Sequence, residues 1–596
     1  MGARAAHRRR RDGHGGAAMR RLSALAVAVA LLGGCAHVEP VAPAAPAPTL
    51  RTPYYGTLEP FASDAVYFVM TDRFVNGDRS NDHREQGGPD PERRTFDRPL
   101  PDANDANIGY LGGDFRGLLD NAGYIADMGF GAVWLTPIVD NPDEAFTGGD
   151  PVGSDAFFKD RGKTGYHGYW GVNFFRLDEH LPSRDLDFAG LTAGLQEHGL
   201  KTVLDIVGNH GSPSFTMPVD QPGFGEIYDA DGRLVADHQN LAPDQLDPAH
   251  NPLHRFFHTE PDLAQLSNND DTSPQVLDYF CRAYRQWIDQ GAAAFRIDTI
   301  RHMPGAFWKG FSDCIRADHP GFFMFGEAFD HDPDKIAPFT WPQNGAVSVL
   351  DFPLKERIDE VFARRPDGAP APGYERIAER LYLSGGPYAN PYELMTFYDN
   401  HDMPRMDAGD NGFIDAHNFL FTARGIPVVY QGSEVGFMRG AAEHAGNRNY
   451  FGQARIDGAA GHPIHDALRR IARVREATPA LQRGLQLNLE MAGDRAAFYR
   501  VLQDGDFAQI ALVLLNKGDA PADFEIARWL QAGRWQAAIA GEAQEVGEGG
   551  TLNTRVPAHG VEVWVLNAPI RRADLRAALD TAMAGRLGGP EAPGTR

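Results

Sequence analysis

The sequence predicts an α/β protein: a (β/α)8 barrel of the TIM type, with a subdomain inserted after the third strand and a C-terminal antiparallel β-sandwich domain. From residue 64 onward, short apolar runs typical of buried parallel strands alternate with amphipathic stretches typical of helices. Four of these runs end in carboxylates, histidine or asparagine, which indicates an active site at the face where parallel barrel strands end. Beyond residue 478 the pattern changes to runs typical of antiparallel strands.

Eight apolar runs are candidates for the barrel strands. They lie at residues 65–70, 131–138, 201–207, 293–298, 321–327, 346–352, 393–399 and 426–432. Helical patterns of apolar residues lie at 115–129, 187–199, 274–290 and 464–477. Eight strands that alternate with helices fit a (β/α)8 barrel.

A polar excursion interrupts this alternation at about 211–272. It is too long for an ordinary loop, so we expect a small subdomain above the barrel top, within a catalytic barrel domain at 54–478. Antiparallel strand patterns then predict a β domain at 479–568. The tail, 569–596, has helical spacing and then becomes rich in Gly and Pro; we expect an exposed helix and assign it no function.

Residues 1–34 have the pattern of a bacterial signal peptide. An arginine pair precedes the apolar stretch 22–32, which is too short to span a bilayer and ends just before Cys35. This pattern resembles a lipoprotein signal, which implies lipid attachment to Cys35; an ordinary secretory signal with an incidental cysteine is the alternative. A Pro/Ala-rich tether at 35–53 follows. We therefore expect a secreted, lipid-anchored protein at the outer membrane, in the periplasm or on the surface of a bacterium.

The composition limits the partners. The chain has 596 residues and a formal net charge of −23, so it repels nucleic acid, and we expect a neutral or cationic partner. Cys281 and Cys314 lie in helix-like stretches. Two buried thiols are the simple interpretation, a disulfide is the open alternative, and no Cys/His spacing indicates zinc. The oligomeric state is open, with a monomer as the expectation.

Three strand-end carboxylates form a set suited to breaking a glycosidic bond. Asp298, Glu327 and Asp402 follow what we count as strands four, five and seven. Such hydrolysis needs one carboxylate facing the anomeric carbon and one carboxyl group that stays partly protonated to protonate the leaving oxygen. Neighbouring strands can place two carboxyl groups at the roughly 5–5.5 Å that a retaining enzyme uses. A third carboxylate can hold sugar hydroxyls.

The strand-end segments VLDIVGNH, FRIDTIRH, FGEAFD and TFYDNHD resemble the four signature regions of the α-amylase family of glycoside hydrolases, in the same order. The resemblance covers about 64–567. It implies that Asp298 is the catalytic nucleophile, Glu327 the general acid/base and Asp402 the transition-state stabiliser. It further implies an α-glucan substrate, with retaining hydrolysis of α-1,4-glucosidic bonds in starch-like glucans, maltooligosaccharides or cyclodextrins.

The same resemblance implies a set of substrate-binding residues. Arg296 would orient the nucleophile and keep it ionised, and Tyr169 in the YHGYW segment would stack on a sugar face. Contacts with the attacked sugar, the leaving sugar and more distant sugars would come from His167, His210, Arg301, His302, His401 and Arg448.

Calcium is the cofactor that the resemblance implies. TDRFVNGDRSND and YLGGDFRG are similar to calcium-binding loops of secreted amylases and cyclodextrin glycosyltransferases, and oxygen donors in number suit Ca²⁺. The implied ligands are Asn76, Asp78, Asn81, Asp82 and Asp114, with the carbonyl of Gly112. An Asx-rich turn without metal is the alternative. A second site would use Asn209 and the backbone of His302, but Gln265 stands where the family has an Asp ligand, so the second Ca²⁺ is left open.

Three departures from the family favour hydrolysis over cyclisation. Pro261 stands where cyclising transferases carry a bulky aromatic, Arg301 replaces a lysine, and the chain has room for only one β domain after the barrel. A 4-α-glucanotransferase or cyclodextrin glycosyltransferase is the alternative, because hydrolases and transferases share one covalent intermediate. A non-catalytic glucan-binding lipoprotein would lack at least one of the three carboxylates, and all three are present. The preferred glucan, the product length and the endo or exo mode stay undetermined.

Overall fold

A computed structural model describes residues 54–88, 93, 95–97, 99, 106–152 and 159–585. The expected signal peptide, Cys35, the tether and the end of the tail lie outside these residues. Within the described ranges, no helix combines the length and the apolar character that crossing a membrane requires.

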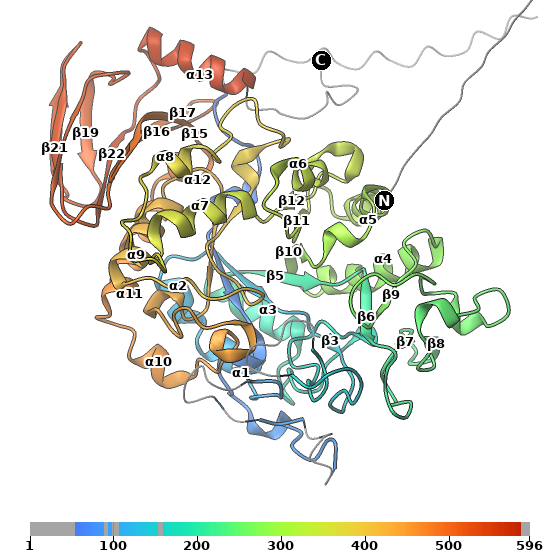
Figure 1. The fold of residues 1–596 in the computed structure, drawn as a ribbon. Helices are drawn as coiled ribbons and strands as arrows, with labels where there is room; N and C mark the ends of the chain where they lie inside the picture. Colours follow the sequence, from blue (N-terminus) through green and yellow to red (C-terminus); the bar gives the residue numbers. More distant parts are fainter. Residues whose placement is uncertain are drawn as a thin grey trace, which may run out of the picture. The chain divides into compact units, whose positions relative to one another are not determined.

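Eight parallel strands form the barrel (Figure 1). They are β1 (Val66–Val69), β2 (Ala132–Leu135), β5 (Lys201–Ile206), β10 (Ala292–Ile297), β11 (Phe323–Gly326), β12 (Ser348–Val349), β13 (Met395–Thr396) and β14 (Ile426–Tyr430). Their hydrogen-bonded order is β12-β11-β10-β5-β2-β1-β14-β13, and a parallel bridge between Leu350 and Met395 brings the two ends of this order together. Seven of the eight strands lie within a predicted run, and β10 begins one residue before its run, so the predicted barrel is confirmed.

The strands form where the sequence has short apolar runs because both faces are buried. All four residues of β1 and of β2 are buried, as expected for strands with helices outside and a packed barrel interior. Inside, Phe68 of β1 stacks on Trp134 of β2 with ring centroids 3.8 Å apart. The apolar interior therefore supports the strand ends from below.

The longer helices are α3 (Phe188–Glu197), α4 (Pro274–Asp289), α5 (Gly305–Asp318), α7 (Phe352–Phe362), α9 (Asp410–Leu420) and α11 (Pro463–Glu476). The predicted helix at 115–129 is instead two short helices, α1 (Phe115–Asp120) and α2 (Ala122–Asp127). Asn121 separates them, because its side chain donates to the carbonyl of Gly117 at 2.8 Å and to Gln453 at 2.9 Å. An asparagine bonded in this way competes with the helical backbone.

The insertion after β5 contains four short strands. Strand β6 (His210–Pro213) pairs antiparallel with β9 (Leu266–Asn268), and β7 (Glu226–Tyr228) pairs with β8 (Leu234–Asp237). A small core links this insertion to the loop after β2, and it comprises Phe146, Trp170, Met217, Phe224 and Leu266. The insertion is therefore packed structure, and it places His210 directly beyond β5.

The C-terminal region contains a six-stranded antiparallel sheet in the order β15-β16-β17-β22-β19-β20. Its strands are β15 (Leu485–Ala492), β16 (Arg495–Asp504), β17 (Phe507–Asn516), β19 (Gly533–Ala537), β20 (Ala543–Val546) and β22 (Gly560–Leu566). Strands β18 (Ala522–Ile526) and β21 (Leu552–Val556) form a second sheet that shares one apolar core with the first. The antiparallel domain that the sequence predicts is confirmed.

Two details at the edges of the fold go beyond the sequence analysis. Helix α13 (Ala573–Gly585), expected to be exposed, buries Leu575 and Leu579 in the core of the C-terminal sheets. The structure also joins Cys281 of α4 to Cys314 of α5 as a disulfide, with Cα atoms 6.4 Å apart. The open choice between two thiols and a disulfide is therefore decided in favour of the disulfide.

Candidate active site

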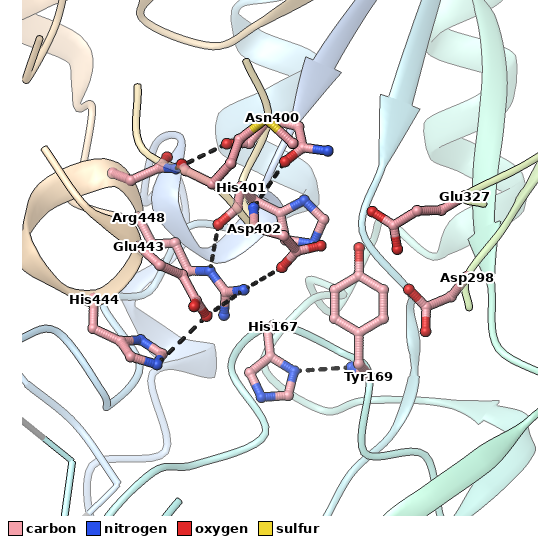
Figure 2. Close-up of polar contacts among 12 residues, drawn as sticks. His167, Tyr169, Asp298, Glu327, Asn400, His401, Asp402, Glu443, His444 and Arg448 are labelled. Carbon is pink, nitrogen blue, oxygen red and sulfur yellow. Dashed lines mark hydrogen bonds and ion pairs between the residues drawn. The ribbon is translucent and has the colours of Figure 1, made fainter. Parts of the chain in front are cut away.

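A cavity of about 420 Å³ lies at the ends of the barrel strands, and Asp298, Glu327 and Asp402 all line it. Figure 2 shows Asp298 and Glu327 side by side, with Asp402 facing them. The structure thus brings the three predicted catalytic carboxylates together.

Strand register explains why two of these carboxylates are neighbours. Strand β10 pairs with β11 so that Ile297 lies opposite Gly326, which makes the next residues, Asp298 and Glu327, neighbours. Each is held by a backbone hydrogen bond of 2.8 Å to the preceding strand, since Asp298 N–H donates to Ile206 and Glu327 N–H to Ile297. The site is therefore built on rigid strand ends.

Asp402 comes from the loop after β13. Its own N–H donates to the side chain of Asn400 at 2.9 Å, and its carboxylate lies 3.1 Å from Nε2 of His401. Nη2 of Arg448 lies 2.5 Å from the other carboxylate oxygen. Two nitrogen donors thus fix the carboxylate across the cavity from Asp298.

Arg296 lies fully buried beneath the cavity and holds both strand-end acids. Its Nη1 is 2.8 Å from Asp298 and its Nη2 is 2.8 Å from Glu327. Nη1 is also 2.8 Å from Asp205, a buried carboxylate that accepts from Trp134 Nε1 at 2.9 Å. One guanidinium therefore neutralises part of the charge of three carboxylates.

The surroundings shift two of the carboxyl groups in opposite directions. Burial raises the pKa of Glu327 well above its ordinary value, and the nearby carboxylates Asp402, Asp298 and Asp205 add to the rise, while Arg296 opposes it. For Asp402, burial also raises the pKa, but His401 and the two arginines outweigh it, so the pKa is lowered. Two carboxyl groups whose pKa values are pushed apart suit an acid and an anion in one site.

The predicted aromatic and histidine contacts surround the same cavity. Tyr169 stacks on His401 with centroids 5.2 Å apart and donates its hydroxyl to Asp205 at 2.8 Å. Burial lowers the pKa of His167 and of His210, and that of His401 to about 3. Neutral imidazoles can share hydrogen bonds with sugar hydroxyls without adding charge.

His210 and the residues after Asp298 complete the predicted set. His210 Nε2 lies 3.9 Å from Asp298. Arg301 lines the cavity beside Asp330, at 3.2 Å, and His302 Nδ1 lies 2.9 Å from Asp262. All the predicted substrate residues line the cavity except Arg296, which lies below it.

Three of the six proposed calcium ligands converge. Asn76 Nδ2 lies 2.7 Å from Asp82, and a Cβ added to Gly112 would lie 2.2 Å from that nitrogen. The side-chain oxygens of Asn76 and Asn81 are buried and have no hydrogen-bond partner among the described residues. Such oxygens suit a hard cation.

Two other proposed ligands are bonded to backbone. The carboxylate of Asp114 accepts from the N–H groups of Gly77, Asp78 and Gly117, and that of Asp78 accepts from Ser80. Both carboxylates therefore support the loop and the start of α1 in this structure.

The proposed second site has a different arrangement from the expected one. Gln265 points away, with hydrogen bonds to Thr216 and Asp160, whereas Asp262 meets Asn209 at 3.0 Å and also His302. The side-chain oxygen of Asn209 is buried, with no hydrogen-bond partner in the described part of the chain.

Several lining residues escaped the sequence analysis. They are Asp160, Lys163, Trp170, Leu263, Phe329, Glu443 and His444, together with the buried Asp205 below them. A carboxylate in the apolar run of β5 was a usable signal for Asp205, because an unpaired charge is rarely buried. The loop residues gave no signal, because their surroundings come from other parts of the chain.

A family model described as the catalytic domain of alpha amylase matches residues 68–221 and 248–454. The chain belongs to the α-amylase family. Members of this family are glycoside hydrolases, so the chain is an enzyme of that class. The residues between the matched segments belong to the insertion that carries β7 and β8.

Related proteins carry two names. An alpha-amylase of Niallia circulans is 28% identical over 554 residues, which are 88% of this chain and 94% of that protein. A cyclomaltodextrin glucanotransferase of Klebsiella oxytoca is 27% identical over 505 residues, which are 77% of this chain and 71% of that protein. Amylases and cyclising transferases are thus similar to this chain to almost the same degree.

Solved structures give the same division. CldA, described as the first cyclomaltodextrin glucanotransferase with a three-domain ABC distribution, is 28% identical with a TM-score of 0.67, and the match covers 85% of this chain and 99% of CldA. The acarbose complex of an alpha-amylase from Geobacillus thermoleovorans shares the fold, with a TM-score of 0.64. The match covers almost all of CldA, so a protein with the transferase name can have this domain content. The expectation that a single β domain after the barrel argues against cyclisation is therefore wrong.

Proposed function

We propose that this member of the α-amylase family hydrolyses α-1,4-glucosidic bonds with retention of configuration, through a covalent glycosyl-enzyme intermediate. The observation that carries the proposal is the pair Asp298 and Glu327, both held 2.8 Å from nitrogens of one guanidinium, with Asp402 opposite. Two carboxyl groups bound by one guanidinium lie close together, as a nucleophile and an acid must in a retaining enzyme.

In the first step, an oxygen of Asp298 attacks the anomeric carbon and the bond to the leaving sugar breaks. Glu327 gives its proton to the leaving oxygen, which the raised pKa of this carboxyl group supports. Arg296 orients the nucleophile from below, and Tyr169 presents a flat ring to the attacked sugar.

In the second step, Glu327 as a carboxylate removes a proton from water, and the water oxygen attacks the anomeric carbon and releases Asp298. Positive charge develops on the sugar ring in both steps. Asp402 is anionic and lies across the cavity, so it can stabilise that charge and hold sugar hydroxyls. The bond broken on the substrate is replaced by one to water, with no redox change.

Water rather than a sugar is the proposed acceptor. The support is Pro261, which is exposed and offers no aromatic face around which a glucan chain could curl. A 4-α-glucanotransferase or cyclodextrin glycosyltransferase is the second candidate, because relatives with the transferase name match almost equally.

Chromatography of an early starch digest distinguishes the two activities. We expect linear maltooligosaccharides, with reducing ends rising in proportion to bond cleavage. Cyclodextrins as the dominant early product would overturn hydrolysis in favour of the transferase.

A Ca²⁺ ion bound by the 76–82 loop is part of the proposal. Its support is the convergence of Asn76, Asp82 and Gly112 and the buried amide oxygens of Asn76 and Asn81. The ion would hold the loop to the start of α1 and take no part in catalysis.

We also propose export and lipid attachment at Cys35, on the strength of the sequence before it. Labelling with a fatty acid should mark the wild type, and Cys35→Ser should abolish the label. A labelled Cys35→Ser protein would contradict this anchor.

A further inference from the structure

A second cavity, of about 640 Å³, lies between the barrel and the C-terminal domain, and we call it the interdomain cavity. Helix α9 contributes Asn411, Ile414 and Asn418 to its wall, at a spacing that places all three on one face of the helix. Helix α11 contributes a second face, and residues 539–540, 555 and 557–562 of the C-terminal domain line the other side. None of the described residues that line this cavity also lines the active-site cavity. Its size is that of a small-molecule pocket, about 300–1,000 Å³.

The wall of the interdomain cavity is largely aliphatic. Ile414, Ile471, Ile539 and Val561 line it, together with alanine and proline residues. Among its described lining residues none is Phe, Tyr or Trp, so no flat ring faces the apolar side of a sugar. The cavity therefore favours a ligand with an apolar body and is a poor fit for a glucan.

Asn418 adds an unpaired amide to this wall. The residue is 4% exposed, and its side-chain amide makes no hydrogen bond with another described residue. A buried polar group without a partner costs free energy unless a ligand or water satisfies it. Because Asn418 lines the cavity, an occupant of the cavity can supply the partner.

Two arginines in the lining have little or no compensation from the protein. Arg470 of α11 makes no hydrogen bond or ion pair with any other residue that the structure describes. Asp466 stands one turn earlier on the same helix, but its carboxylate accepts from the N–H of Gly461 at 3.3 Å. Arg555 lies 3.8 Å from Asp523, with side chains that are 66% and 77% exposed, so this contact is weak.

The other ionisable groups of the lining are already bonded within the protein. The two carboxylate oxygens of Glu562 accept from the N–H groups of Ile539 and Ala540, each at 3.0 Å. His559 lies between two carboxylates, with Nδ1 2.7 Å from Asp415 and Nε2 3.0 Å from Asp519. The groups left to meet a ligand are therefore a guanidinium and an amide, both of which donate hydrogen bonds.

We propose that the interdomain cavity binds a small organic anion with an apolar body. The anionic group contacts Arg470, Asn418 donates a hydrogen bond, and the apolar body lies against the isoleucine side chains. Such a ligand touches both domains, so it stabilises the folded enzyme by mass action. The site is separate from glucan cleavage and does not depend on it.

The probe for the test is 8-anilinonaphthalene-1-sulfonate, which combines an aromatic body with one sulfonate and fluoresces in apolar surroundings. We expect saturable binding of one dye per folded wild-type chain. Arg470→Gln should weaken binding by at least about tenfold, because a hydrogen bond to a charged group is lost. Asn418→Ala should weaken it by a smaller factor, about threefold to tenfold.

A matched control lies next to Arg470 on the same helix. Arg469 does not line the interdomain cavity and donates to the carbonyl of Asp127, so Arg469→Gln should leave dye binding unchanged. Arg470 has no partner to lose within the described protein, so Arg470→Gln should fold and keep the wild-type rate on starch. Circular dichroism and a starch assay verify both points.

Competitors test each part of the ligand. Octanoate should displace the dye, whereas 1-octanol, which has no charge, and inorganic phosphate, which has no apolar body, should displace it far less. Displacement by 1-octanol or by phosphate as good as that by octanoate would overturn the corresponding part of the proposal.

Three further results would overturn the site itself. They are the absence of saturable binding, an equal loss in Arg469→Gln and Arg470→Gln, and displacement of the dye by maltoheptaose, which would place the dye in a glucan site.

Discussion

Two buried arginines hold the carboxylates of this cavity, and they do so at different depths. Arg296 lies fully buried on β10 and binds Asp205, Asp298 and Glu327, which belong to three neighbouring strands. Arg448 lines the cavity, comes from the loop after β14 and joins Asp402 to Glu443. The first arginine fixes the reacting groups on rigid strands, and the second arranges groups that hold the sugar. Changes at the Arg296 end should therefore remove the covalent step, whereas changes at the Arg448 end should weaken both the stabilisation of the transition state by Asp402 and the binding of the sugar.

The largest effect is expected at the Arg296 end. Asp298→Asn should lower kcat by several orders of magnitude, because the covalent route disappears while the strand end keeps its shape. Steady-state kinetics on a maltooligosaccharide, with circular dichroism as the control for folding, measures it. Retention of more than a tenth of the activity in a clean preparation would contradict the role of Asp298.

Glu327→Gln should show a dependence on the leaving group. Loss of a general acid typically costs about 10²–10⁴-fold on a natural glucan, whereas a glycosyl fluoride needs no proton and should suffer far less in the first step. Single-turnover rates on both substrate types measure the difference. Equal losses on the two would contradict the acid role and leave Glu327 as a binding group.

Calcium removal should lower the stability of the fold and leave the catalytic groups that the two arginines hold unchanged. At free Ca²⁺ of about 100 times Kd, a ligand bound only by the folded state adds about 2.7 kcal/mol of stability. Chelation should therefore lower Tm and added Ca²⁺ should restore it, with Asp82→Asn giving a smaller response. An unchanged Tm after exhaustive chelation, with no metal found by elemental analysis, would remove the calcium proposal.

The smallest expected effects are the contributions of two carboxyl groups to the pH dependence of stability, and they differ in sign between the Arg296 end and the Arg448 end. The pKa of Glu327 is raised in the folded state, so the folded protein binds more protons than the unfolded one, and this stability is lost as pH rises. Glu327→Gln should thus raise Tm at pH 7. The pKa of Asp402 is lowered, so its contribution is present above the unfolded pKa and is lost at lower pH.

Asp402→Asn should accordingly lower Tm at pH 7. Melting curves of the wild type and both variants between about pH 3 and 8 give the comparison, because the contribution of Asp402 is lost only below its unfolded pKa of about 3.9. The same sign of change in both variants would mean that the two ends are not electrostatically distinct.

The sequence predicted the barrel and the Arg296 end well because both depend on local patterns. A strand end needs a short apolar run and a carboxylate directly after it, and Asp298 and Glu327 follow such runs. Register between neighbouring strands then brings them together without further information.

The Arg448 end was predicted only in part because its geometry depends on contacts between distant loops. Glu443 and Lys163 are 280 positions apart, and neither lies in an apolar pattern that marks a strand end. The sequence also did not show which polar side chains bond to the backbone. Asn121 divides an expected helix through such a bond, and Asp114 accepts from N–H groups of the neighbouring loop.

Trapping of the covalent intermediate tests the central claim most directly. Incubation with a 5-fluoro-α-glycosyl fluoride, followed by intact mass measurement and peptide mapping, should show one added glycosyl group on Asp298 and none in Asp298→Asn. An adduct on another residue would contradict retaining catalysis at the Arg296 end. The same holds for a protein that carries no adduct and releases products of inverted configuration.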